Sequence, residues 1–585
     1  MVAPMLPSVR TADCCMCCCS ATKRCNNCNN NVVIVVLRGS NTRWAASTPM
    51  RSVDCYILLY RRVIGNATHH DQPRVLSQHQ TLSARTAFGY ALCHCPNGST
   101  FKREDRPMPE TPEITAATQR TLQGQRLKYY IENEPAGDRV DQFLRAFAAV
   151  LEFSDYRPLL DSYCTSSAKC NRCAVSCPVY LATGDPRDIP CYRTNLLLDI
   201  YRRYFTIGGA VEARFSRSFE LTDDVIDDML EVFYRCTACR RCTRSCPMGV
   251  DHGLITRLGR YALSLIGIVP KALQVSVREQ LEGDTHNTSK VPKEALMNTL
   301  EFLSEELEDI LGVTMTFPVD QTDRDYVFYC AVSDYLMEPE TLMGNAAVLY
   351  AAGDWDKWTI GTGNYDGINY GLFYSDWHLE NIIKRLVAEV TRLRGRNVLI
   401  GECGHASRSA HDFVPVFGGK EAYPVVSFIE YTLDCIRKKR ITLNPDIITE
   451  RVTYHDPCNI ARSGWIVEQP RDILRSFVKN FVDMVPHGQE NYCCGGGGGL
   501  VSVDEIHDFR MEIGGRVKAE QLQKVHADIV IAPCANCKKQ LKELVEYYEL
   551  PCKVMGLHDL ILKAIEIPGA KSPAERAEEA ALLAV

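Results

Sequence analysis

The first half of the chain carries apolar residues at helical spacing. In LTDDVIDDMLEVFYR (221–235) they recur every three or four positions, Thr222 is placed to cap the first turn, and acidic residues follow it. The segment YRTNLLLDIYRRYF (192–205) has the same pattern. These apolar stripes predict a helical region over about residues 108–315, with the stripes buried in its core.

A different pattern begins near residue 320, where short β-branched or aromatic runs end in cysteine. Four such runs, YVFYC, NVLIGEC, VTYHDPC and DIVIAPC, end at Cys330, Cys403, Cys458 and Cys534. Helical segments such as ENIIKRLVAEVTRL (380–393) lie between them. This alternation predicts an α/β arrangement, in which sites usually form at the carboxyl ends of the strands.

The same four cysteines indicate an internal repeat. Cys330 and Cys458 are 128 residues apart, and Cys403 and Cys534 are 131 apart. At these offsets, three cysteines of the second copy have no cysteine in the first: Cys493, Cys494 and Cys537 correspond to Tyr365, Asp366 and Ala406. We therefore expect a degenerate repeat over 320–440, an intact repeat over 441–570 and a C-terminal tail over 571–585.

Composition excludes several classes of protein. The chain has 585 residues, 28 cysteines and a net charge of −6, which argues against a nucleic-acid partner. No apolar run approaches the roughly 18 residues that a membrane helix needs. From Cys164 onward, most cysteines stand in CxxC, CxxxC or CC groups, which suit metal ligation in a reducing compartment. We therefore expect a cytoplasmic protein with no transmembrane segment of its own, peripheral at the membrane.

Residues 1–107 do not match the rest. They contain thirteen Lys or Arg against five Asp or Glu and have no clear periodicity. DCCMCCCS (13–20) and CNNC (25–28) look metal-like, but no partner group has a regular spacing. We expect a disordered tail, or upstream sequence translated from a start chosen too early, with Met108 as the start. A metal-binding or arginine-rich targeting arm is the alternative.

RCTACRRCTRSCP (235–247) is the strongest chemical signal in the chain. Its cysteines have the spacing C-x2-C-x2-C-x3-C and a proline follows: they are Cys236, Cys239, Cys242 and Cys246. This is the bacterial ferredoxin run, in which three thiolates hold one cubane [4Fe–4S] cluster and the fourth goes to a second cluster. Zinc sites use two separated CxxC pairs instead.

An incomplete copy of this motif lies upstream, in YCTSSAKCNRCAVSCP (163–178). Cys170, Cys173 and Cys177 match its last three positions, but the first position is Ser167. Cys164 is the expected substitute, with Cys191 as a rival and a three-iron cluster as a further alternative. The crossing pattern predicts two cubane clusters, one on Cys164, Cys170, Cys173 and Cys246 and the other on Cys177, Cys236, Cys239 and Cys242. The predicted fold class is α+β multidomain: a helical 2[4Fe–4S] ferredoxin domain followed by two α/β repeats.

Three segments of the second repeat, HDPCN (455–459), CCGGGGG (493–499) and APCANC (532–537), resemble the cysteine-rich CCG domain. Joined to two ferredoxin motifs, they resemble the iron–sulfur subunit of heterodisulfide reductase (HdrD-like). Within that family the chain looks nearest to the DsrK- and TmcB-type subunits of membrane-bound electron-transfer complexes of sulfate reducers. The resemblance covers about residues 120–565.

The resemblance implies a noncubane [4Fe–4S] cluster on five cysteines of the second repeat: Cys458, Cys493, Cys494, Cys534 and Cys537. The glycines that follow Cys494 would let the backbone approach this cluster, leave room for a substrate sulfur and offer N–H donors: Gly495, Gly496 and Gly497 are the first of them. The first repeat lacks the cysteines for an equivalent cluster. Cys330 and Cys403 would then be relics, or would line the substrate cleft with His405.

The resemblance also implies an activity, that of a heterodisulfide reductase-like oxidoreductase. Electrons would pass through the two cubane clusters to the noncubane cluster, which reduces or forms a disulfide or trisulfide on a small sulfur-carrier protein. His405 or His455 could supply a proton. The expected electron partner is a haem-b membrane subunit, linked to a quinone, on the inner face of the cell membrane.

Two rival interpretations stay open. One is an iron–sulfur relay subunit of a quinone-linked, flavin-dependent 2-hydroxyacid or glycerol-3-phosphate dehydrogenase. Such a subunit needs a separate flavoprotein, because no dinucleotide fingerprint is present. The other is a zinc-stabilised scaffold without catalysis.

Overall fold

The computed structural model describes residues 32–35, 58–61, 127–133, 135–215 and 219–583. The chain divides into two compact units, Met1–Arg103 and Glu104–Val585. In the first unit, strands β1 (Val32–Val35) and β2 (Leu58–Arg61) pair antiparallel. The remainder of the predicted N-terminal extension, with its cysteine groups, lies outside the described residues. The tail and the targeting arm therefore both stay predictions.

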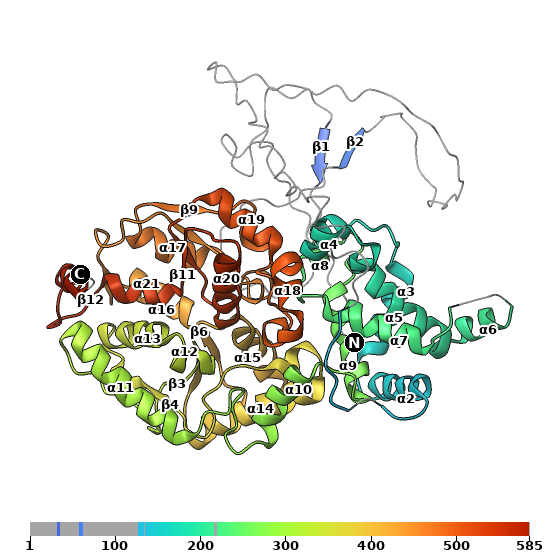
Figure 1. Cartoon of the computed structure of the whole chain (residues 1–585), viewed down its shortest axis with the longest axis horizontal. Helices are drawn as coiled ribbons and strands as arrows, with labels where there is room; N and C mark the ends of the chain where they lie inside the picture. Colours follow the sequence, from blue (N-terminus) through green and yellow to red (C-terminus); the bar gives the residue numbers. More distant parts are fainter. Residues whose placement is uncertain (1–31, 36–57, 62–126, 134, 216–218, 584–585) are drawn as a thin grey trace, which may run out of the picture. The chain divides into compact units, whose positions relative to one another are not determined.

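The helical region extends from α2 to α11 (Figure 1). Its helices are α2 (Arg139–Glu152), α3 (Tyr156–Ser166), α4 (Pro178–Thr183), α5 (Pro190–Phe205), α6 (Ile207–Phe215), α7 (Asp223–Tyr234), α8 (Arg241–Arg244), α9 (His252–Leu265), α10 (Lys271–Glu282) and α11 (Lys293–Leu311). Thr222 caps α7 as predicted, because its side chain accepts a hydrogen bond from the N–H of Val225. The buried face of α7 packs with residues of α2, α3, α5 and α9 in one core.

Two four-stranded parallel sheets follow, and they have the same strand order. The first has the order β4–β3–β5–β6, with β3 (Tyr326–Tyr329), β4 (Trp358–Ile360), β5 (Asn397–Ile400) and β6 (Val425–Ser427). The second has the order β9–β8–β10–β11, with β8 (Val452–Tyr454), β9 (Phe481–Asp483), β10 (Ile529–Ile531) and β11 (Lys553–Met555). In both, the first strand in the sequence lies between the second and the third. The predicted α+β fold with two α/β repeats is confirmed.

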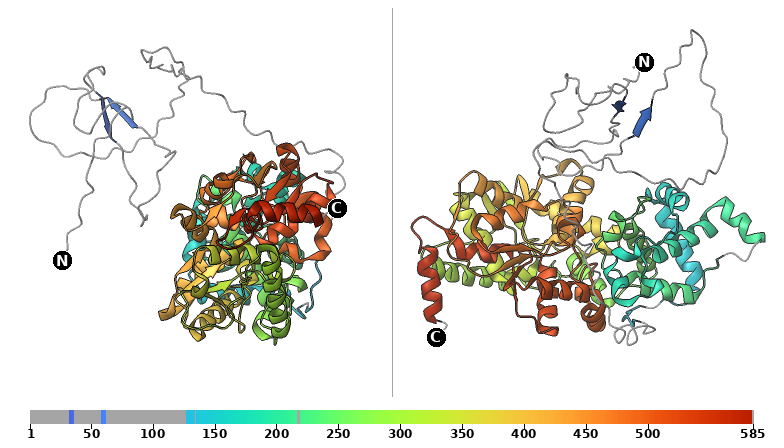
Figure 2. Two further views of the ribbon diagram at one scale, coloured as in Figure 1. Left: turned by 90° about the vertical axis from the view of Figure 1, so that its left-hand side faces the viewer. Right: turned by 90° about the horizontal axis from the view of Figure 1, so that it is seen from above.

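Helices connect and cover the strands (Figure 2). Those of the first repeat are α12 (Val332–Leu336), α13 (Pro339–Ala351), α14 (Asp376–Arg392), α15 (Gly404–Phe417) and α16 (Phe428–Arg437). Those of the second are α17 (Glu468–Phe477), α18 (His507–Phe509), α19 (Arg516–Val525), α20 (Ala535–Tyr547) and α21 (Leu557–Ala564). A small antiparallel pair, β7 (Thr442–Leu443) with β12 (Ile565–Glu566), and the C-terminal helix α22 (Pro573–Leu583) complete the unit.

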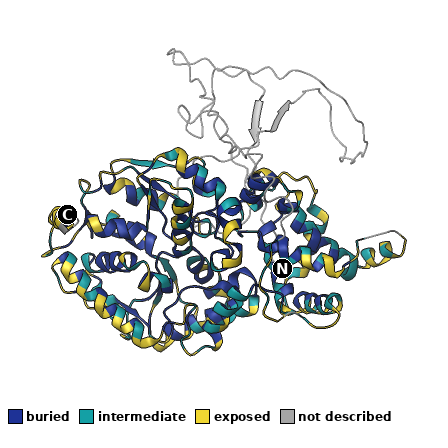
Figure 3. Ribbon diagram, in the orientation of Figure 1, coloured by how far each residue is buried: buried dark blue, intermediate teal, exposed yellow. Residues whose placement is uncertain are grey.

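The two sheets share one hydrophobic core. Because side chains alternate along a strand, Phe328 of β3 and Ile531 of β10 both face this shared core. Tyr329 faces a second core on the other side of the first sheet, and Val530 faces a cysteine-rich core on the other side of the second sheet. Figure 3 shows the buried residues gathered on the strands and the inner sides of the helices. Within the described residues, no helix is both long and apolar enough to span a membrane.

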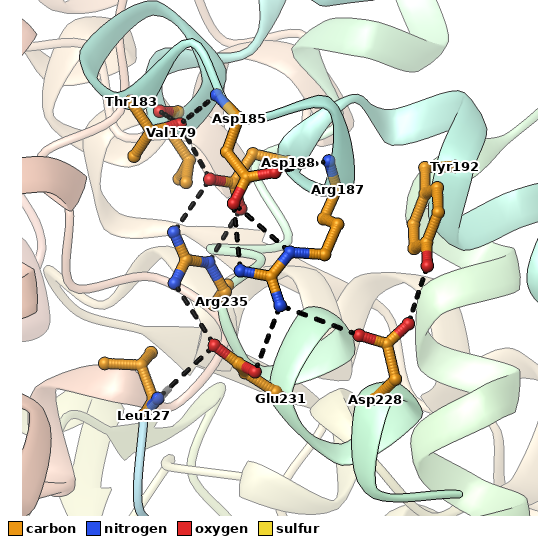
Figure 4. A network of polar contacts seen from close by, with 10 residues as sticks. All are labelled: Leu127, Val179, Thr183, Asp185, Arg187, Asp188, Tyr192, Asp228, Glu231 and Arg235. Carbon is orange, nitrogen blue, oxygen red and sulfur yellow. Dashed lines mark hydrogen bonds and ion pairs between the residues drawn. The ribbon is translucent and has the colours of Figure 1, made fainter. Parts of the chain in front are cut away.

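A buried polar network joins the two cysteine motifs of the helical region (Figure 4). Both carboxylate oxygens of Asp188 accept a hydrogen bond from Arg235 at 2.7 Å, and the Thr183 hydroxyl donates a third at 2.7 Å. Arg235 directly precedes Cys236, and Asp188 lies two residues before the first residue of α5. The ion pair therefore holds the start of α5 against the second motif.

Candidate metal centres

Four cysteines from both motifs meet at what we call the inner site: Cys177, Cys236, Cys239 and Cys242. Cys177 comes directly before α4 and Cys242 lies in α8. The backbone of Ala238 and Arg240 is left-handed, with φ of 52° and 59°, and it turns the loop that carries Cys236 and Cys239. Burial and the neighbouring sulfurs of Cys239, Cys236 and Cys177 raise the pKa of Cys242. The crossing of one cysteine from the first motif to three of the second is the arrangement predicted from the spacing.

A second pocket, the outer site, is lined by cysteines from three segments. Cys170, Cys173 and Cys246 line it as predicted, together with Ser167 and Cys191. The thiols of Cys173 and Cys191 are hydrogen-bonded to each other, and this bond is the main reason why the pKa of Cys191 falls to about 6.

The expected fourth ligand of the outer site, Cys164, is not among the residues that line this pocket. It lies in the last turn of α3 and packs against the helical core. Arg202 donates a hydrogen bond to its carbonyl oxygen, and burial raises the pKa of its thiol. The structure therefore separates Cys164 from the residues with which it was grouped.

The five cysteines of the second repeat converge at a third centre, the CCG site: Cys458, Cys493, Cys494, Cys534 and Cys537. The sulfurs of Cys494 and Cys537 are 3.6 Å apart, and hydrogen bonds join Cys493 to Cys458 and Cys494, and Cys534 to Cys537. His455 contributes a ring nitrogen within 4.8 Å of the sulfurs of Cys494 and Cys537. All but Cys458 are buried. This compact group of sulfurs is the arrangement that an iron–sulfur cluster requires.

Buried cations surround these cysteines, and they test whether the donor set fits an iron–sulfur cluster. They are Arg193, Arg260, Arg462 and Lys518, all less than 9 % exposed. Among the described residues, Nε of Arg193 and Nη2 of Arg462 have no hydrogen-bond partner. Burial opposes the charge of Arg193, but the sulfurs of Cys236, Cys177 and Cys242 raise its pKa. Buried cations require compensating negative charge, and thiolate-ligated clusters supply it, so the residues fit such a group.

The inner site and the CCG site touch each other. Cys239 packs with Cys493 in one buried cluster, and the nearby sulfur of Cys493 raises the pKa of Cys239. Arg462 spans the junction, donating to the carbonyl oxygen of Cys239 at 2.7 Å and to that of Asn491 at 2.9 Å. A ligand of one site is thus in direct contact with a ligand of the next.

The glycine run after Cys494 forms much of this junction. A Cβ on Gly497 would lie 2.4 Å from the carbonyl oxygen of Thr237, and one on Gly498 would lie 3.0 Å from that of Cys236. Gly498 also has a φ of +69°, which side chains rarely adopt. The backbone N–H of Gly495 points at the Cys493 sulfur, at 3.4 Å. Glycine is thus required for contact with the ferredoxin loop, a reason that the sequence pattern does not reveal; the expected approach to the cluster stays a prediction.

In the first repeat, polar side chains occupy the positions that the sequence offset matches to Cys493 and Cys494. Asp366 accepts hydrogen bonds from the N–H and hydroxyl of Thr288 at 2.8 and 2.7 Å, and the Tyr365 hydroxyl donates to the carbonyl oxygen of Val291 at 3.1 Å. Cys330 is buried, and burial raises the pKa of its thiol. A hydrogen-bonded network therefore replaces a cluster site there, consistent with a degenerate repeat.

Cys403, in contrast, reaches the CCG site from the first repeat. It is hydrogen-bonded to Cys534, and its sulfur lies 3.6 Å from Nδ1 of His405. Nδ2 of Asn536 is 3.4 Å from the same nitrogen, and the ring of Tyr370 stacks on His405 at 5.4 Å. Asn536 and Tyr370 also line an open cleft of about 510 Å³. The wall of the cleft is therefore in contact with His405, which lies beside the CCG site.

Comparisons with known proteins agree with these centres. Residues 162–250 match the 4Fe-4S dicluster domain, and residues 452–542 match the CCG family, described as a cysteine-rich domain. The chain is 29 % identical over 465 residues to the Hdr-like menaquinol oxidoreductase iron–sulfur subunit 2 of Archaeoglobus fulgidus, covering 72 % of this chain and 83 % of that one. It is 23 % identical over 408 residues to a subunit of the dihydromethanophenazine:CoB–CoM heterodisulfide reductase of Methanosarcina barkeri, covering 68 % and 93 %. The chain is similar to the HdrD-like iron–sulfur subunits over about two thirds of its length.

The HdrD-like chain is therefore an oxidoreductase subunit with iron–sulfur clusters. The name of a third relative points to a different role: the EtfAB:quinone oxidoreductase of Syntrophomonas wolfei is 22 % identical over 448 residues, covering 71 % of this chain and 60 % of that one.

Several residues around the centres of this HdrD-like protein were not found from the sequence. The four buried cations lie outside the cysteine motifs, and no local pattern in the sequence marks them. Cys191 was named only as a rival; its position just inside a helix that begins with Pro190 was the available sign.

Proposed function

We propose that this HdrD-like subunit passes electrons from the outer site through the inner site to the CCG site, where a disulfide or trisulfide on a small sulfur-carrier protein is reduced or formed. The observation that carries this proposal is the contact between Cys239 and Cys493. It joins the inner site to the CCG site, and Cys242 of the inner site packs with Cys173 and Cys191 of the outer site.

Two cubane clusters and one noncubane cluster, when bound, would each carry single electrons. The role of the protein is to hold the three centres at fixed positions relative to one another. Arg260 donates to the carbonyl oxygens of Cys236 at 2.5 Å and Gly498 at 2.9 Å, and Arg462 makes the equivalent bridge from Cys239. These two buried arginines clamp the ferredoxin loop to the second repeat, so the distance between the sites is set by the fold.

The cleft beside His405 is the proposed entrance for the substrate sulfur. His405 lies between Asn536 on the cleft wall and Cys534 of the CCG site. His455 lies beside Cys494, and burial lowers its pKa, which keeps it neutral. Of the two histidines, His405 is therefore the better placed to deliver a proton to a thiolate that leaves toward the cleft.

The membrane side of the reaction is proposed from the relatives. The names of two of them contain menaquinol and dihydromethanophenazine, both carriers of electrons. We assign the exchange of electrons with a quinone to a haem-b membrane subunit of the same complex, with this chain peripheral on the inner face of the membrane. The DsrK/TmcB-type assignment is the corresponding proposal within the family.

A relay function is the second candidate, and the likeness to an EtfAB:quinone oxidoreductase favours it. In that case a separate flavoprotein would donate electrons, and the CCG site would pass them on without binding a disulfide. The two functions differ in whether a sulfur compound reacts at the CCG site.

The test is disulfide or trisulfide reduction by the anaerobically purified protein, with reduced viologen as the electron donor. We expect activity in the wild type, its loss in Cys494→Ser, and its retention in the control Cys435→Ser, since Cys435 is buried in α16 beside Arg440. Full activity in Cys494→Ser would contradict the proposal. Wild-type protein that oxidises a reduced flavoprotein but reduces no sulfur compound would establish the relay function.

A further inference from the structure

The outer site lacks one ligand by the rule of its motif. A complete run would place a cysteine at position 167, where the chain has serine. The remaining motif cysteines, Cys170, Cys173 and Cys246, supply three sulfurs to the pocket. A fourth sulfur must come from outside the motif if the outer site is to hold a complete four-iron cubane.

We propose that Cys191, from the start of helix α5, is the fourth ligand of the outer cubane. It lines the same pocket as the three motif cysteines and packs with Cys173 in one buried cluster. It is 4 % exposed, so its sulfur faces the protein rather than solvent. This inference rests on the proposed presence of a cubane at the outer site and adds its ligand set.

The local structure favours a thiolate at this position. Cys191 is the second residue of α5, a helix of 16 residues, so the positive end of the helix dipole lies beside its sulfur. Nδ2 of Asn195, one turn later on the same helix, donates a hydrogen bond to that sulfur at 3.4 Å. A side-chain donor and the helix dipole thus both favour negative charge on this sulfur, as is typical of a metal-bound thiolate.

The buried network of Figure 4 fixes where Cys191 lies. Asp188, three residues before it, is locked to Arg235 by two hydrogen bonds of 2.7 Å, and Arg235 is adjacent to Cys236 of the inner site. Protein contacts alone therefore hold the start of α5 against the second motif. A ligand carried on such a rigid element can substitute for one that the loop of the first motif lacks.

The two competitors for this role are less well placed. Cys164 lies on α3 against the helical core, and burial raises the pKa of its thiol although Arg202 lies nearby. Ser167 does line the pocket, but it offers a hydroxyl, whereas iron–sulfur clusters select soft thiolate ligands. Cys191 is therefore the residue that combines a thiol with a place at the pocket wall.

Electron paramagnetic resonance and iron content test the assignment, because both report the cluster without relying on activity. In Cys191→Ser we expect the outer cubane to convert to a three-iron cluster, visible as a new signal in oxidised protein, or to be lost with its iron. The matched variants Cys164→Ser and Ser167→Ala should keep the wild-type spectrum and iron content. A wild-type spectrum in Cys191→Ser, or the new signal in Cys164→Ser, would overturn the proposal.

A rescue variant guards against a folding defect. Ser167→Cys combined with Cys191→Ser restores the complete motif, so we expect it to regain the four-iron spectrum. In wild-type protein, alkylation mapped by mass spectrometry gives a second readout: removal of iron should expose Cys191 together with Cys173 and leave Cys164 unchanged. Equal labelling of Cys191 before and after iron removal would contradict the assignment, whereas loss of disulfide reduction with an intact outer spectrum would count only against the proposed function.

Discussion

The ion pair between Asp188 and Arg235 makes a quantitative prediction about the helical region. Replacing Asp188 by Asn keeps the size of the side chain but removes its charge. Three hydrogen bonds of 2.7 Å end on this carboxylate. In the variant, Arg235, whose side chain is 4 % exposed, would keep only Glu231 as an anionic partner, at 3.5 Å.

The cost follows from leaving a buried charge without its partner. Removing one partner of a buried ion pair typically costs about 3–5 kcal/mol. The Asn side chain can still accept one hydrogen bond, from Arg235 or Thr183, so we expect the lower end, about 3 kcal/mol. The control is Asp185→Asn, because Asp185 pairs with the partly exposed Arg187 and Asn caps a helical turn as well as Asp does. It should cost less than about 1 kcal/mol.

The assay is denaturant unfolding followed by circular dichroism under anaerobic conditions, with iron content measured on the same samples. Asp188→Asn should lower the midpoint of the transition and reduce the iron at the inner and outer sites, while Asp185→Asn stays close to wild type. Equal effects of the two substitutions, or an Asp188→Asn protein within about 0.5 kcal/mol of wild type, would refute the reasoning from burial.

Two further substitutions test the junction and its charge. Gly497→Ala should destabilise the protein by about 1–3 kcal/mol, since its Cβ would overlap the carbonyl oxygen of Thr237, and it should slow electron transfer to the CCG site. Thermal melts measure the first effect and rapid-freeze spectroscopy the second. The control is Gly208→Ala, whose Cβ would meet no neighbour within 4 Å. Lys518→Met should lower the reduction potential of the CCG site, because Lys518 interacts electrostatically with Cys493 and Cys494 and the loss of such a nearby unit charge is worth on the order of 2 kcal/mol, or roughly 90 mV for one electron. A redox titration that finds the same potential, or the same shift in the exposed control Lys524→Met, would contradict this.

Local rules explain what the sequence could predict. The N-cap of α7 at Thr222 and the buried stripe of this helix depend only on residues close in the sequence, and the structure has both features. The same holds for the strands that end near a cysteine. Cys403 and Cys534 each follow their strand by three residues, so the offset of 131 reflects a true structural equivalence.

The other pairing of cysteines shows where sequence offsets fail. Cys330 directly follows β3, whereas Cys458 lies four residues after the end of β8. An offset of 128 between them therefore does not join equivalent positions in the two sheets. Hydrophobic patterns place a strand within a few residues, but the strand end depends on packing that the pattern does not record.

Contacts between segments that are far apart in the sequence could not be predicted from the sequence. Gly497 meets Thr237 across 260 residues of chain, and the arginine clamps depend on the same docking of the second repeat on the ferredoxin loop. The glycine run could be interpreted only as a need for close approach; what it approaches became visible when both segments were placed. The same is true of Cys191, whose role depends on the position of α5 relative to the first motif.

Electron paramagnetic resonance of fully oxidised, anaerobically purified protein, with and without a thiol ligand, tests the central claim most directly. Cubane clusters should be silent in this state. The account predicts a spin-half signal that appears or shifts on addition of the thiol and is absent in Cys494→Ser. A silent spectrum in both samples, with iron present, would contradict sulfur chemistry at the CCG site.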